Sequence, residues 1–228
     1  MPPCPAHDRK GFRMDETSPA TDESKAPVES QALEAFLDRP MMKYVGFALL
    51  LAWHYTLWFI PDFFFDVQLL DDRVTVSWIV NLVATALFLF IIAAALGRKR
   101  HLSDCAAALP TATAIAAVGT VTLGFLPFQL VPAAVYYGLS LVIAAAEAVL
   151  WILWGERYAC IKANFTISHI GTVFGLTLLV SVAVAAALPS VLTAPFAALL
   201  PLASGVILGF TRSDGRRTFP VLLPRSAT

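Results

Sequence analysis

Six long apolar blocks fill this chain between residues 41 and 210, and no other feature constrains its fold as strongly. A helix needs about 20 apolar residues to cross the hydrocarbon core of a bilayer. Because backbone amides cannot stay unpaired in lipid, such blocks are expected to fold as helices. The predicted spans are Met41–Ile60, Val74–Leu96, Ala106–Leu126, Pro132–Trp154, His169–Leu188 and Ala194–Phe210. We therefore expect an all-α polytopic membrane protein with six transmembrane helices.

The composition argues against most soluble functions. Hydrophobic residues make up 58% of the chain and charged residues 14%, whereas a soluble domain is about 25% charged. The Lys and Arg residues do not form a basic stripe that could follow a phosphate backbone, so direct nucleic-acid binding by this chain is not expected. The histidines lack the spaced partners of a metal site, and no nucleophile lies in a pattern with a base. We expect no metal, no cofactor and no enzymatic activity.

The two ends of the chain differ from the middle. Residues 1–40 are polar and rich in Pro, Ser, Thr and Glu, without the apolar core of a signal peptide. This composition is typical of a disordered tail. Residues 30–38 form either a short helix on the membrane surface or a frayed linker. Residues 41–210 form the six-helix membrane domain, and residues 211–228 form a short basic tail.

Basic residues lie on alternate connections between the blocks. The second connection carries Arg98, Lys99 and Arg100, and the fourth carries Arg157 and Lys162. The first connection, residues 61–73, has a single Arg against four Asp, and the third and fifth have no basic residue. Because cytoplasmic loops are enriched in Lys and Arg, both termini are predicted to lie in the cytoplasm.

Tryptophans gather near the predicted ends of the first and fourth spans. They are Trp53, Trp58, Trp151 and Trp154. Amphipathic rings favour the level of the lipid headgroups, so these residues are expected to anchor the helices at the interface. An aromatic ligand cage at the outer mouth is the alternative.

Three polar side chains within the spans form a candidate intramembrane site. Glu147 could carry a proton or bind a cation, or it could hydrogen-bond across helices. His54 could pair with Asp62, line an outer cavity or pack among aromatic rings. Asn81 is expected to donate a hydrogen bond to another helix.

Two pairs of glycines have the four-residue spacing that lets membrane helices approach closely. Gly171 and Gly175 lie in the fifth block, and Gly205 and Gly209 lie in the sixth. We expect them to pack inside the bundle, and a homodimer seam is the alternative.

Two short segments carry a family resemblance. A basic turn, Gly97–Asp104, follows the second span, and a loop motif of Trp154, Gly155, Glu156 and Arg157 follows the fourth. The chain resembles the six-span half of a major-facilitator bundle. In particular it is similar to the N-terminal membrane part of bacterial multi-span LuxR-type regulators. The resemblance implies the bacterial cytoplasmic membrane and a small or apolar ligand bound within the bundle.

Those regulators carry a soluble helix-turn-helix domain after their membrane part. Residues 211–228 are too short for that domain, so the resemblance does not carry DNA binding over to this chain. Three functional hypotheses follow. They are a membrane sensor or regulatory module, a half-size proton-coupled transporter subunit that acts as a dimer, and a truncated fragment without activity.

Overall fold

The computed structural model describes residues 40–59, 72–97, 101–127, 130–159 and 163–213, and these residues are helical apart from short turns. The helices are α2 (Pro40–Phe59), α3 (Asp72–Leu96), α4 (Ala108–Phe125), α5 (Ala133–Ala159), α6 (Ala163–Ala187) and α7 (Ser190–Ser213), with a 3₁₀ turn η2 (Leu102–Asp104). The all-α prediction is confirmed for this part of the chain. The segment at 30–38, most of the first connection and most of the two predicted tails lie outside the described residues. The tail boundaries are slightly wrong, because residue 40 begins α2 and residues 211–213 end α7.

Five of the helices have the length and composition needed to cross a membrane. They contain the stretches Thr75–Leu96, Ala108–Phe125, Ala133–Ala159, Ile170–Ala187 and Ser190–Thr211. Helix α2 is also 20 residues long, but Lys43, His54 and several Tyr and Trp residues make it less apolar. These helices are compatible with an integral membrane protein, as the apolar blocks predict.

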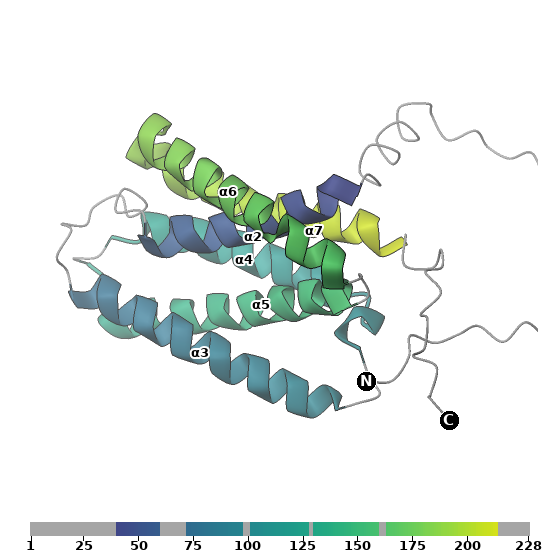
Figure 1. The fold of residues 1–228 in the computed structure, drawn as a ribbon. Coiled ribbons are helices and arrows are strands. Elements are labelled where there is room, and N and C mark those ends of the chain that lie inside the picture. The colour runs from purple at the N-terminus through teal and green to yellow at the C-terminus, as the bar shows by residue number, and fades with distance from the viewer. Residues whose placement is uncertain (1–39, 60–71, 98–100, 128–129, 160–162, 214–228) are drawn as a thin grey trace, which may run out of the picture.

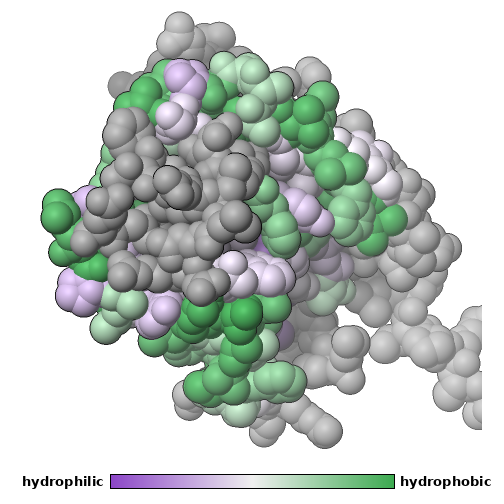
Figure 2. Space-filling model, turned by 90° about the vertical axis from the view of Figure 1, so that its left-hand side faces the viewer, coloured by the Kyte–Doolittle hydropathy of each residue, from purple (hydrophilic) through white to green (hydrophobic). Residues whose placement is uncertain are grey.

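Neighbouring helices form a series in the order α3, α5, α4, α7, α2 and α6 (Figure 1). Helices α3 and α6 stand at the two ends of the series, so each presents a broad face away from the bundle. Those faces are apolar, with Leu87 and Phe90 exposed on α3 and Phe174 and Leu179 exposed on α6. Figure 2, which views the bundle from the end where α3 begins, shows green apolar side chains along its outer sides. Exposed apolar helix faces of this kind suit contact with lipid chains.

The interior is built around two buried tryptophans. Trp53 and Trp154 are both 0% exposed and belong to one apolar cluster of α2, α4, α5 and α7. The Trp53 indole N–H donates to Thr120 Oγ1 at 2.9 Å, and that of Trp154 donates to Ser204 Oγ at 3.0 Å. The expected interfacial anchoring is therefore wrong for these two residues. Each indole N–H finds an acceptor on another helix, so its ring can fill the core without losing a hydrogen bond.

Several helix ends differ from the predicted boundaries; for example, α6 begins at Ala163, six residues before the predicted start at His169. Helix α5 continues to Ala159, so Trp154, Gly155, Glu156 and Arg157 are helical and the loop assignment of this motif is wrong. The helix persists because the segment has no proline and because Tyr158 packs one turn after Trp154, with ring centroids 5.9 Å apart.

Helix α7 begins at Ser190, one turn before the predicted start of the last span, and carries two prolines in its interior. The Thr193 hydroxyl donates to the Pro189 carbonyl at 3.3 Å, which pairs a backbone acceptor at the start of the helix. The interior prolines, Pro195 and Pro201, lack the N–H that would bond the carbonyls of residues 191 and 197, and membrane helices tolerate such prolines.

The two glycine pairs have different surroundings. A Cβ placed on Gly205 would lie 2.2 Å from Thr113 Cγ2 of α4, so α4 and α7 approach each other closely there. A Cβ on Gly209 would meet Leu109 at an ordinary 3.7 Å. A Cβ on Gly171 or Gly175 would meet no atom within 4 Å. In the described bundle only the pair on α7 therefore faces another helix.

We predict that Gly205→Ala destabilises the protein and that Gly171→Ala does not. The methyl group at residue 205 meets Thr113, whose hydroxyl is already held at 3.0 Å by the Leu109 and Pro110 carbonyls. Overpacking of this kind costs about 1–3 kcal/mol. Thermal unfolding in detergent measures the difference, and equal midpoints for the two variants would contradict the close α4–α7 contact.

Candidate functional site

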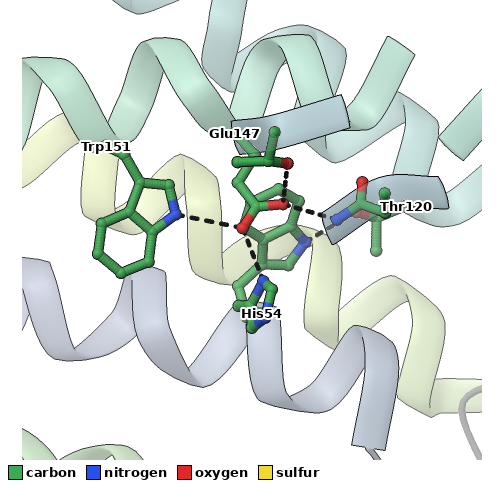
Figure 3. A network of polar contacts seen from close by, with 7 residues as sticks. His54, Thr120, Glu147 and Trp151 are labelled. Carbon is green, nitrogen blue, oxygen red and sulfur yellow. Dashed lines mark hydrogen bonds and ion pairs between the residues drawn. The ribbon is translucent and has the colours of Figure 1, made fainter. Parts of the chain in front are cut away.

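The centre of the bundle holds a buried carboxylate. Glu147 of α5 is 2% exposed. Its Oε1 lies 2.7 Å from His54 Nδ1 of α2 and accepts a hydrogen bond from Trp151 Nε1 at 3.1 Å. Trp151 lies one helical turn after Glu147 on the same helix, which places both side chains on one face. Figure 3 shows Trp151 and His54 converging on this side of the carboxylate.

The second carboxylate oxygen faces α3. Asn81 Nδ2 donates to Glu147 Oε2 at 2.9 Å, and the Thr85 hydroxyl donates to the same oxygen at 3.4 Å. Asn81 and Thr85 are four residues apart, so α3 presents both to α5 on one face. The Glu147 cluster, defined here as His54, Asn81, Thr85, Glu147 and Trp151, therefore joins α2, α3 and α5.

The hydrogen-bond partners of Glu147 are donors, as a carboxylate requires. An indole N–H can only donate, and the Asn81 amide is oriented with its N–H₂ toward the oxygen, so both oxygens act as acceptors. The contact with His54 has the distance of an ion pair, but Nδ1 has no aligned hydrogen bond within the structure. The cluster thus holds two ionisable groups in contact, with Glu147 buried and the His54 side chain 19% exposed.

Within the described ranges, no three His, Cys, Asp or Glu side chains gather as a group that could hold a metal ion. His54 and Glu147 alone would offer a cation two ligands, with the Asn81 Oδ1 nearby as a neutral oxygen. A proton needs no such ligand set, since one acceptor atom is enough to bind it. Proton binding is accordingly the simplest chemistry open to the cluster.

A second polar contact lies at the far end of α5. The Glu156 carboxylate accepts hydrogen bonds from the backbone amides of Leu102 and Ser103 at 2.7 and 2.9 Å. His101 Nδ1 lies 3.9 Å from Glu156 Oε1. Upstream, Gly97 ends α3 with a φ of 61°, a conformation that L side chains rarely adopt. The two segments that carry the family resemblance therefore contact each other through Glu156.

The structure brings together Glu147, His54 and Asn81, the three residues of the candidate intramembrane site, although their contacts with one another are not predicted from the sequence. Asp62, considered there as a partner of His54, lies outside the described residues. The contributions of Thr85 and Trp151 were missed. The four-residue spacings from Asn81 to Thr85 and from Glu147 to Trp151 are a signal that could have identified them.

Comparison of the chain with protein family models, with curated proteins and with solved structures finds no match.

We predict that Glu147→Gln and His54→Phe are energetically coupled. A glutamine has one oxygen for several donors and turns an N–H₂ group toward them, which should cost about 1–3 kcal/mol of unfolding free energy. In a double-mutant cycle the coupling should exceed about 1 kcal/mol, because the two side chains touch.

The matched control pairs Glu147→Gln with Ser204→Ala, which removes the acceptor of Trp154 on α7. These two changes share no partner and should add to within about 0.5 kcal/mol. Detergent unfolding curves supply all values. Additivity of the Glu147 and His54 changes would mean that their contact contributes nothing to stability.

We also predict that Glu156→Ala exposes two specific amides. Without the carboxylate, the Leu102 and Ser103 N–H groups lose their acceptor, and their hydrogen exchange should accelerate about tenfold. Asp104→Ala is the control, because Asp104 accepts from the His101 amide at 3.3 Å and not from the other two. Unchanged exchange at residues 102 and 103 in Glu156→Ala would refute the capping role.

Proposed function

We propose that this protein is a six-span integral membrane protein of the bacterial cytoplasmic membrane that works as a non-enzymatic sensor or regulatory module. Five helices with the length and apolar character of membrane spans support this proposal, with α2 as the sixth. The alternation of basic connections supports the placement of both termini in the cytoplasm.

The buried Glu147 cluster is the observation that carries the proposal. An ionisable side chain inside a membrane domain is costly to maintain, and its usual justification is functional. Here one carboxylate contacts side chains from α2, α3 and α5. A change in its charge would alter the contacts of three helices at once, as a two-state sensing element requires.

Aromatic contacts extend from the cluster toward the end of α5. The Trp151 and Phe47 rings meet edge to face at 5.5 Å, and Phe47 meets Tyr158 at 5.1 Å. The Tyr158 hydroxyl donates to the Lys43 carbonyl at 3.4 Å. Packed side chains therefore run without interruption from Glu147 to the end that is expected to face the cytoplasm. Such a chain of contacts supports signalling from the cluster to that end.

The similarity to the membrane part of LuxR-type regulators favours the same class of function. In this proposal the sensing bundle responds to a proton or to a small or apolar ligand. DNA binding is not assigned to these residues.

A half-size proton-coupled transporter acting as a homodimer is the second candidate. The contact of two ionisable groups, His54 and Glu147 at 2.7 Å, is what favours it. Transport by alternating access requires a second repeat, and the open surroundings of Gly171 and Gly175 on α6 would accommodate the helix of another copy.

One experiment separates the two candidates. The protein is reconstituted into vesicles that contain a pH-sensitive dye, and a pH gradient is imposed. A sensor should show a pH-dependent change in tryptophan fluorescence without proton flux, and Glu147→Gln should abolish that change because it removes the titrating carboxyl group. Proton flux that disappears in Glu147→Gln would instead establish the transporter. A wild-type protein that shows neither response would contradict both.

A further inference from the structure

Several buried polar atoms near Glu147 lack a hydrogen-bond partner within the described structure. Besides His54 Nδ1, they include Ser77 Oγ and Asn81 Oδ1 on α3, and Ser140 Oγ on α5. The side chains of the last three residues are 1%, 0% and 0% exposed. An unpaired buried polar group is destabilising, and native proteins usually satisfy such groups with buried water.

These three atoms lie on one side of Glu147 along the helix axes. Ser77 precedes Asn81 by one helical turn, and Ser140 precedes Glu147 by about two turns. Helices α3 and α5 pack side by side and run in the same direction, since Glu156 near the end of α5 contacts Leu102 just after α3. The unpaired atoms therefore mark the α3–α5 interface between Glu147 and the end where both helices begin.

The other side of Glu147 is closed by aromatic rings. Phe47 contacts Trp151, Trp154 and Tyr158 with centroid distances of 5.5, 5.9 and 5.1 Å. The Trp154 N–H is already paired with Ser204 Oγ, so it offers nothing to a water molecule there.

The side where α3 begins also has aromatic rings, with Phe59 and Trp78 at 5.7 Å, but it contains the three unpaired polar atoms. On the other side the rings pack on one another next to Glu147, and the Tyr158 hydroxyl is paired with the Lys43 carbonyl.

We propose that water along Ser77, Asn81 and Ser140 connects Glu147 to the face where α3 and α5 begin, and that protons reach the cluster from that face alone. This inference rests on the proposed function, because it names the route by which the Glu147 cluster is titrated. On the expected orientation this face is extracytoplasmic. A proton passed along the water bonds to a Glu147 oxygen, while the last water keeps the electron pair and is re-protonated from the next.

Few other ionisable groups face this carboxylate. Helix α2 contributes His54, α3 contributes the non-titrating Asn81 and Thr85, and α5 itself contributes Trp151. Helix α4 has no ionisable side chain between Ala108 and Phe125. In α7, which touches α5 lightly, Arg212 is the single charged residue and lies near the helix end. A carboxyl protonation signal at the centre would therefore report Glu147.

The test follows Glu147 by infrared pH-difference spectroscopy of the full chain in vesicles. Its carboxyl band is identified by its loss in Glu147→Gln. The orientation of the protein in the vesicles is determined with an impermeant maleimide in a Cys4→Ser/Cys160→Ser background. The maleimide labels Cys105, which is exposed just after η2. The pH is then changed on one side at a time. We expect the band to follow the compartment at the beginning of α3 and α5.

Removing the two hydroxyls should slow this response. We expect Ser77→Val/Ser140→Val to lower the rate by about tenfold, because the water loses hydrogen-bond partners. If the valines disturb folding, the Ser77→Ala/Ser140→Ala double variant replaces them, and it should also slow the response. Ser181→Val is the matched control, because Ser181 Oγ on α6 is also buried and unpaired but lies away from α3 and α5.

Two results would overturn the inference while sparing the proposed function. One is a band that follows the compartment at the end of α5, and the other is a Ser77/Ser140 rate equal to that of the Ser181 control. A Glu147 band that responds to neither compartment would overturn the inference together with the proposed sensing role.

Discussion

The satisfied carboxylate of Glu147 is the interaction on which the arrangement of α2, α3 and α5 depends. Helices in a membrane gain little from burying apolar surface against each other, because the lipid is equally apolar. Directional contacts therefore decide which helices meet and in which register. Glu147 accepts hydrogen bonds from Asn81 and Thr85 on one side, and on the other side it lies 2.7 Å from His54 Nδ1. A single side chain thus specifies the position of two neighbouring helices relative to α5.

The remaining helices are positioned by close packing and by hydrogen bonds of tryptophan indoles. Trp53 and Trp154 each link two helices, to Thr120 on α4 and to Ser204 on α7. Gly205 allows α7 to approach α4 at Thr113. In contrast, α2 is the one described helix with which α6 makes extensive contact, and the glycines of α6 face open space. The bundle is therefore specified most tightly at its centre and least tightly at α6.

Much of the fold could be predicted from the apolar blocks, because bilayer thickness sets helix length regardless of sequence detail. The polar residues of the site could also be singled out, since Glu147, His54 and Asn81 interrupt apolar segments. Their meeting could not be predicted, because it depends on the rotation and register of helices far apart in the sequence. The same limit explains the error at Trp154: position along a helix indicates depth, but the face that a ring occupies depends on neighbouring helices.

The location of the Glu147 cluster also bears on how the chain is assembled during synthesis. Helices α2 and α3 emerge from the ribosome before α5, so Asn81 and Thr85 are synthesised before the carboxylate that accepts their hydrogen bonds. Since α3 packs mainly on α5, its contact with α2 before that point is limited to pairs such as the Phe59 and Trp78 rings, whose centroids are 5.7 Å apart. In a membrane, the apolar outward face of α3 would hold the helix in the lipid. Until α5 is made, Asn81 would form hydrogen bonds with other polar groups. The hydrogen bonds of Asn81 and Thr85 to Glu147 form once α5 has been made. The order of the helices in the chain therefore determines how long α3 lacks its main partner.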